Sequence, residues 1–178
     1  MLNLGRVVSL AKLEQNPDHH LILHEIIHGH RRVNGRDLSL RSLLRVASLA
    51  RLFPRQVHVL LSNHELAQVR SEGILKDGVS LVDAFDEGLE FLYGDEATEV
   101  RVALGRFVGA YPLAVKCSNG VLCAHSLPSP RVMETFDPTV LDRALEPKDV
   151  RSGGAAHQMV WGRYLSQNLA DKLAQAWG

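Results

Sequence analysis

One apolar run that ends in three polar residues constrains the fold of this chain most. Val57–Leu61 is rich in valine and leucine, and Ser62 then leads directly into Asn63, His64 and Glu65. A short apolar run with this ending is typical of a buried strand. Open α/β sheets place their ligands at the carboxyl ends of such strands, so the run predicts a binding site there. The same residues also fit a plain helix start, because asparagine is a good N-cap.

Strand-like and helix-like segments alternate along the chain, which favours an α/β fold class. We expect a βαβ unit in which residues 21–25 and 57–62 are parallel strands and residues 39–52 are the connecting helix. Ser118-Asn119-Gly120 lies between two further strand-like segments and predicts a β-hairpin, because Asn-Gly accepts positive φ at low cost. The two hairpin strands are expected at residues 113–117 and 121–125. The expected architecture is therefore a βαβ unit plus a β-hairpin with flanking helices, in a single domain over residues 1–178.

The charge balance of the 178 residues excludes a strong global field. Lysine and arginine together number 20, as do aspartate and glutamate. Binding to nucleic acid or to a membrane surface is therefore not indicated, and any phosphate chemistry must depend on local groups or metals. No apolar run is long enough to cross a bilayer. Two cysteines, Cys117 and Cys123, and the lack of an N-terminal apolar stretch predict a cytoplasmic location.

A run of acidic residues follows the predicted βαβ unit and is expected to form a solvated helix face. Its members are Asp83, Asp86, Glu87 and Glu90. We assign no chemistry to this run, because acidic residues along a helix usually face water.

Three segments together resemble the calcineurin-like metallophosphoesterases, in particular the branch of serine/threonine protein phosphatases and dinucleotide polyphosphate phosphatases. The first segment, residues 57–65, is similar to that family's strand followed by Gly-Asn-His-Glu, with Ser62 at the glycine. Residues 119–128 resemble its hairpin leading into Val-His-Gly-Gly-Leu-Pro, with Ser126 at a glycine. Residues 160–163, Val-Trp-Gly-Arg, are similar to a later tryptophan-containing segment. The order also agrees, and the resemblance covers roughly residues 10 to 165.

The resemblance implies a partial metallophosphoesterase-type sheet sandwich and a metal-dependent phosphoesterase that hydrolyses a phosphate ester through metal-activated water. It implies two divalent metal ions, manganese, iron or zinc, with Glu25, Asn63 and His125 as ligands. His64 would protonate the leaving oxygen, and the Glu65 carboxylate would orient the His64 ring. Arg31, Arg32 and Arg163 would contact the phosphate. The phosphorylated substrate stays open among a phosphoprotein, a dinucleotide polyphosphate and a small phosphomonoester.

The chain also departs from the family's pattern. The family's Asp-x-His motif and closing Gly-His motif have no counterpart here. Glu25 stands where the family has a metal-bridging aspartate, while His28 and Gly29 stand at its Asp-Arg pair. We therefore expect a domain truncated at both ends. Because the ligands exclusive to the first metal are missing, we also expect this chain to hydrolyse p-nitrophenyl phosphate poorly or not at all with manganese present.

Two other function classes stay open. His24-Glu25-Ile26-Ile27-His28 satisfies His-Glu-x-x-His, which on a helix holds zinc between two histidines and uses the glutamate as general base of a metallopeptidase. That reading requires a helix through residues 24–28. The second alternative is a non-catalytic domain that binds a partner through a phosphatase-like core. Metal content and folding distinguish these alternatives from the phosphoesterase.

Overall fold

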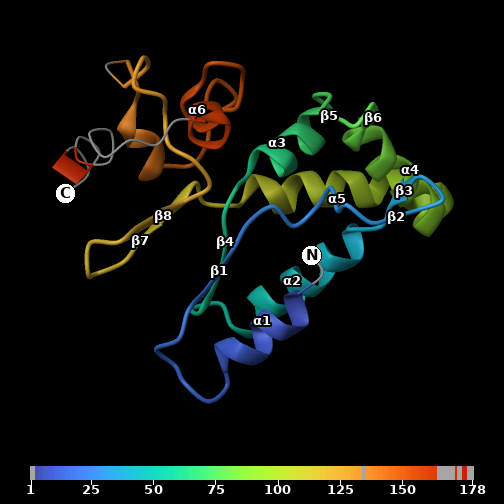
Figure 1. Ribbon diagram of the computed structural model, residues 1–178, viewed down its shortest axis with the longest axis horizontal. Coiled ribbons are helices and arrows are strands. Elements are labelled where there is room, and N and C mark those ends of the chain that lie inside the picture. Colours follow the sequence, from blue (N-terminus) through green and yellow to red (C-terminus); the bar gives the residue numbers. More distant parts are fainter. Residues whose placement is uncertain (1–2, 134, 164–170, 172–173, 176–178) are drawn as a thin grey trace. The chain divides into compact units, whose positions relative to one another are not determined.

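The structure, a computed structural model, describes residues 3–133, 135–163, 171 and 174–175 (Figure 1). The chain divides into two compact units, Met1–Val59 with His64–Tyr111 and Leu60–Asn63 with Pro112–Gly178. Both helices and short strands are present, so the fold is mixed α/β as predicted. The interpretation of the chain as one domain is not tested by this division and stays a prediction.

The first unit contains most of the regular elements. In chain order these are α1 (Leu4–Ala11), β1 (Leu21–Leu23), β2 (Arg32–Val33), β3 (Arg36–Asp37), α2 (Leu40–Leu52), β4 (Val57–Val59), α3 (Asn63–Arg70), β5 (Leu75–Lys76), β6 (Val79–Ser80), α4 (Leu81–Tyr93), η1 (Gly94–Glu96) and α5 (Ala97–Gly109). Helix α3 begins at Asn63, the last residue of a short segment of the second unit. The elements of the second unit are β7 (Ala114–Lys116), β8 (Leu122–Ala124), η2 (Pro138–Leu141) and α6 (Ala155–Trp161).

The predicted βαβ pairing is confirmed. Strands β1 and β4 pair in parallel, with Leu21 opposite Val57 and Leu23 opposite Val59, and α2 lies between them in sequence. Helix α2 buries Leu40, Leu43 and Val46 along one face, as expected of an amphipathic helix. Figure 1 shows β1 and β4 side by side.

Both parallel strands are shorter than predicted, for local reasons. β1 ends at Leu23, and Glu25 has a left-handed φ of 51°, which extended strands do not adopt. β4 ends at Val59, after which the Leu61 N–H donates to the Pro112 carbonyl at 2.9 Å. The segment that approaches Asn63 is therefore held by the second unit rather than by β1.

The predicted hairpin is also confirmed, with β7 and β8 pairing antiparallel around Val115 and Cys123. Gly120 provides the positive φ of 85° in its turn. The first unit contains two further hairpins, β2–β3 and β5–β6, which turn at Asn34-Gly35 and Asp77-Gly78. All four of these turn residues have positive φ. The second of these hairpins carries Lys76, which becomes important below.

Helix α4 forms the centre of the core of the first unit. It buries Leu81, Val82, Ala84, Phe85, Gly88 and Leu89, and Ser80 caps its start by accepting from the Asp83 N–H at 3.3 Å. At Gly88 the helix approaches the backbone of β3 so closely that an added Cβ would lie 2.0 Å from the Asp37 carbonyl oxygen. This close approach places β3 directly against α4. None of the helices in the described part of the chain has the length and apolar character of a membrane span.

Candidate functional site

Helix α3 brings His64 to the wall of a cavity of about 510 Å³ in the first unit. The loop after β1 supplies the facing carboxylate, because Glu25 Oε1 lies 3.8 Å from His64 Nε2. His64 is half-buried, and Glu25 is more exposed. Burial lowers the pKa of His64, the neighbouring His28 lowers it further, and the Glu25 carboxylate opposes this shift. Glu25 and His64 are thus two predicted site residues that the structure brings together.

A second histidine lies behind His64. His28 Nδ1 lies 2.9 Å from His64 Nδ1, and the other ring nitrogen of His28, Nε2, lies 2.8 Å from Gln68 Oε1. The Gln68 amide in turn donates to Asp86 Oδ1 at 3.0 Å. Arg101 Nε donates to the same oxygen at 3.1 Å. A continuous set of hydrogen bonds therefore runs from the cavity wall through the buried His28 and Gln68 to the partly exposed pair of Asp86 and Arg101.

Glu65 holds the loop that carries Glu25. Its side chain is fully buried, and Oε1 accepts from the backbone N–H groups of Ile26 at 2.6 Å and Ile27 at 3.2 Å. The loop after β1 has a left-handed residue on each side of this contact, at Glu25 and His28. Glu65 thus satisfies the backbone donors of a turn that cannot pair in the sheet. Its predicted role in orienting His64 stays a prediction.

Basic side chains also line the cavity. The exposed Arg31, one of the predicted phosphate contacts, lies on its wall together with His30 and Lys76. Lys76 Nζ lies 3.5 Å from His30 Nδ1, which links the β5–β6 hairpin to the loop after β1. Asp37 is buried in the wall and accepts from Gly29 N at 3.1 Å and from Ser39 N at 2.8 Å. A cavity with these cationic groups beside a histidine and a carboxylate suits an anionic ligand.

The predicted metal ligands belong to different units. Glu25 lies in the first unit, whereas Asn63 and His125 belong to the second, where His125 directly follows β8. Their convergence on a metal ion therefore stays a prediction. Asn63 is buried, and none of the described residues donates to its Oδ1. A buried amide oxygen that lacks a donor fits a ligand of a divalent cation, so the donor chemistry of Asn63 agrees with a metal site.

The described residues contain no group of three or more histidine, cysteine, aspartate and glutamate side chains arranged to hold a metal ion. An amide oxygen is a further type of donor that a metal ion can use. The amide oxygen of Asn63 is such a donor.

The two remaining predicted phosphate contacts lie elsewhere. Arg32 is in β2, and none of the described residues accepts from its buried Nε. Arg163, in the second unit, is exposed and its guanidinium lies 5.7 Å from the centre of the Trp161 ring. Among the three predicted arginines, only Arg31 lies on the wall of the His64 cavity.

The zinc-peptidase alternative is wrong, because it requires a helix through residues 24–28. Residues 24–28 form no helix, and Glu25 and His28 have left-handed backbone angles that interrupt one. Both ring nitrogens of His28 are moreover engaged by His64 and Gln68. A histidine needs a nitrogen lone pair to bind zinc, so His28 is not available as the second ligand.

The predicted solvated face is exposed at Asp83, Glu87 and Glu90, as expected, but only partly exposed at Asp86. Its side chain is half-buried and accepts from both Gln68 and Arg101. Sequence reasoning likewise assigned no role to His28 within the phosphoesterase, nor any role to Gln68 or Lys76. The spacing of His64 and Gln68, four residues apart on one helix, places them on one face and is the signal that would have linked Gln68 to the site.

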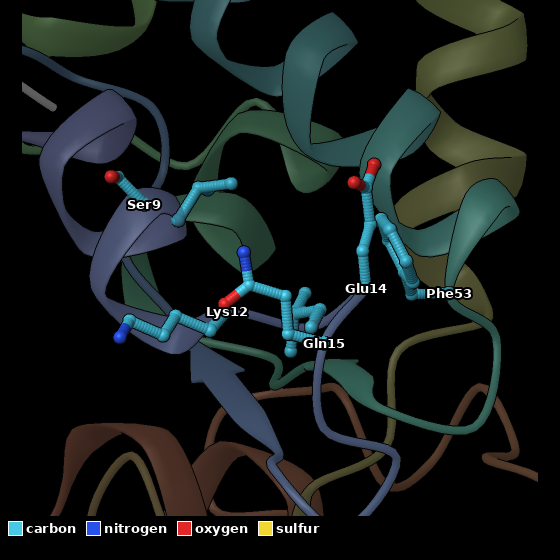
Figure 2. Close-up of a pocket in the computed structure, with 7 residues that line it drawn as sticks. Ser9, Lys12, Glu14, Gln15 and Phe53 are labelled. Atoms are coloured by element: carbon cyan, nitrogen blue, oxygen red, sulfur yellow. The ribbon is translucent and has the colours of Figure 1, made fainter.

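A second cavity, of about 250 Å³, lies beside α1. Figure 2 shows Ser9, Lys12, Glu14, Gln15 and Phe53 around it. Among the described residues, its lining combines one lysine and one glutamate with apolar, hydroxyl and amide side chains and includes no histidine. The His64 cavity, which joins acid–base groups to cationic ones, is therefore the better candidate site.

Comparison with known proteins adds no assignment. The chain matches no protein-family model, and no curated protein or solved structure is significantly similar to it.

Proposed function

We propose that this chain is a metal-dependent phosphoesterase that binds the phosphate group of its substrate in the His64 cavity. The observation that carries the proposal is the grouping of His64, Glu25 and Arg31 around one cavity of about 510 Å³. An acid–base group beside cationic side chains is what hydrolysis of a phosphate ester needs on the protein's side. The calcineurin-like pattern in the sequence supports the same reaction class and a sheet sandwich of that type.

The basic side chains bind the substrate. Arg31 and Lys76 attract the phosphate oxygens, and the planar guanidinium of Arg31 can donate two parallel hydrogen bonds to them. His64 Nε2, when protonated, donates its proton to the oxygen that leaves phosphorus. Glu25, 3.8 Å away, stabilises the positive charge on the ring before this transfer. The cavity thus places binding and proton donation side by side.

A divalent metal held by Asn63 and His125, both in the second unit, would supply Lewis-acid chemistry and acidify a bound water. Asn63 retains a buried acceptor oxygen for this purpose. The amide oxygen of Asn63 and the imidazole of His125 are ligand types compatible with manganese, iron or zinc. The same proposal includes a phosphorylated substrate, which is a phosphoprotein, a dinucleotide polyphosphate or a small phosphomonoester, and a cytoplasmic location.

Hydrolysis of p-nitrophenyl phosphate by the full chain, with and without manganese, tests the proposal. We expect slow turnover that depends on manganese. His64→Ala should lower this rate about a hundredfold, the usual effect of removing a general acid. The matched control is His58→Ala, which breaks the His20–His58 contact of 3.0 Å outside the cavity and should leave the rate unchanged.

The outcomes separate the function classes. Turnover that disappears in His64→Ala and persists in His58→Ala supports the phosphoesterase. Equal rates in the two variants would contradict it. Saturable binding of inorganic phosphate without any manganese-dependent turnover would also contradict an enzyme and would favour the non-catalytic binding domain.

A further inference from the structure

Four side chains of the first unit form a hydrogen-bonded series whose direction can be worked out from donor chemistry. The series is His64, His28, Gln68 and Asp86, with consecutive separations of 2.9, 2.8 and 3.0 Å. The two imidazole rings meet edge-on at 67°, with ring centres 5.1 Å apart. This geometry aims one Nδ1 at the other and is that of an N–H···N hydrogen bond.

The carboxylate of Asp86, at the far end of the series, sets the direction. An ionised carboxylate only accepts, and Asp86 Oδ1 also accepts from Arg101 Nε at 3.1 Å. The group of Gln68 that faces Asp86 must therefore be the amide nitrogen. The amide oxygen then faces His28 Nε2, and since this oxygen also only accepts, Nε2 of His28 carries a hydrogen.

The position of the hydrogen on His28 in turn determines which ring nitrogen of His64 is the donor. His28 is buried, and burial lowers its pKa despite the opposing hydrogen bond from Gln68, so its ring is neutral at neutral pH. A neutral imidazole has one N–H and one lone pair. With the hydrogen on Nε2, the lone pair of His28 is on Nδ1. The contact between the two rings then requires that His64 donates from its own Nδ1.

We infer that His28, Gln68 and Asp86 are positioning residues that hold neutral His64 in the Nδ1–H tautomer, so that the lone pair of Nε2 faces Glu25 and the cavity. The tautomer follows from the hydrogen bonds together with the neutral state of the buried His28 ring, whereas the use of Nε2 in catalysis rests on the proposed function. Nε2 is the ring atom next to Glu25 and the cavity, at 3.8 Å from Oε1.

The proposed step balances in protons and electrons. Water oxygen bonds to phosphorus as the phosphorus–oxygen bond of the ester breaks, and that electron pair goes to the leaving oxygen. His64 Nε2–H gives its proton to this oxygen, and the ring returns to the neutral Nδ1–H tautomer. The proton lost by the attacking water returns to solvent, from which Nε2 is protonated again.

The tautomer is measured directly by long-range ¹H–¹⁵N correlation spectra of the full chain with labelled histidine, at a pH where His64 is neutral. We expect His64 in the Nδ1–H form, whereas free neutral histidine prefers Nε2–H. His28 is expected as Nε2–H. An unmodified chain with His64 in the Nε2–H form would overturn the inference without any variant.

Gln68 variants test the series itself. Gln68→Leu removes the acceptor of His28 and should release His64 into the Nε2–H form or a mixture. Gln68→Glu is the conservative rescue: its carboxyl shares a proton with Asp86 while still accepting from His28, so the Nδ1–H form should return. The His20–His58 pair, which contains no Gln68 contact, is the control within the same spectrum. A Gln68→Leu chain that keeps the Nδ1–H form overturns the inference.

A kinetic readout separates this inference from the proposed function. With p-nitrophenyl phosphate and manganese, Gln68→Leu should lower kcat at least tenfold with little change in KM, and Gln68→Glu should restore it. An unchanged kcat with an altered tautomer contradicts the role in proton exchange. If the unmodified chain shows no turnover but His64 is in the Nδ1–H form, the proposed function fails and the positioning series stands.

Discussion

At the residue scale, the function of Glu65 is decided by what surrounds its side chain rather than by its place in the motif. Its carboxylate is fully buried and accepts from the N–H groups of Ile26 and Ile27. The sequence predicted a polar, functional residue here and did not predict these backbone partners. Partners 38 and 39 residues away depend on how β1 and α3 come together, which no local pattern contains.

Replacing Glu65 therefore tests a structural role. Glu65→Ala leaves two buried N–H groups without an acceptor and should lower the free energy of unfolding by on the order of 2–4 kcal/mol. Glu65→Gln keeps one acceptor oxygen and should cost less. Glu87→Ala, on the exposed face of α4, should change stability by less than about 0.5 kcal/mol. Urea denaturation measures all three, and a neutral Glu65→Ala would exclude the buried contact.

His28 makes stability depend on pH. Burial lowers its pKa below the ordinary value of 6.5, so the unfolded chain binds more protons than the folded chain just below that pH. The stability that the neutral, buried ring contributes is full above pH 6.5 and is lost as the pH falls through the unfolded and then the folded pKa. We expect the free energy of unfolding to decrease between pH 7.5 and 5.5. His28→Gln should make the free energy of unfolding depend less on pH over this range, as measured by urea denaturation at each pH. The same pH dependence in the variant and the unmodified chain would contradict the role assigned to His28.

At the scale of elements, local signals predicted those parts whose partners are near in sequence. The Asn119-Gly120 turn was sufficient for β7 and β8, and the helical spacing of leucines was sufficient for α2. Asn34-Gly35 and Asp77-Gly78 carry the same turn signal, but the strands beside them are two residues long and have no alternating pattern. The β5–β6 hairpin was therefore missed, and Lys76 with it.

Gly88 tests how α4 fixes the wall of the cavity. In a solvated helix, glycine to alanine stabilises by about 0.5–1 kcal/mol. Here an alanine Cβ would lie 2.0 Å from the Asp37 carbonyl oxygen, so Gly88→Ala should destabilise by about 1–3 kcal/mol through overpacking. Gly105→Ala in α5 is the matched control, since among the described residues its Cβ would meet only Val69 Cγ1, at 3.9 Å, and it should stabilise. Thermal unfolding compares the two variants, and the same sign in both would exclude the close approach.

At the scale of the whole molecule, the sequence predicted the α/β class and the parallel pairing of β1 with β4, both of which the structure confirms. It did not predict the division into two units. After β4 ends, Leu61 donates a backbone hydrogen bond to Pro112, about 50 residues later, and Leu60–Asn63 therefore belongs to the second unit. For the site, the motif residues His64 and Glu25 were predicted. The partners His28, Gln68 and Asp86 were not, because their hydrogen bonds join the loop after β1 to the helices α3 and α4.

The net charge of zero makes phosphate binding a test of local rather than global electrostatics. With 20 basic and 20 acidic residues, the molecule as a whole does not attract anions. Arg31→Ala and Arg45→Ala change the net charge by the same amount, but only Arg31 lines the His64 cavity, while Arg45 is exposed on α2. Titration calorimetry with inorganic phosphate should show affinity lowered roughly tenfold by Arg31→Ala, the usual worth of one charge-assisted contact, and nearly unchanged by Arg45→Ala. The affinity of the unmodified chain should decrease as salt is added, because these charges are partly exposed. Equal losses in the two variants would mean that phosphate responds to net charge alone and does not bind in the cavity.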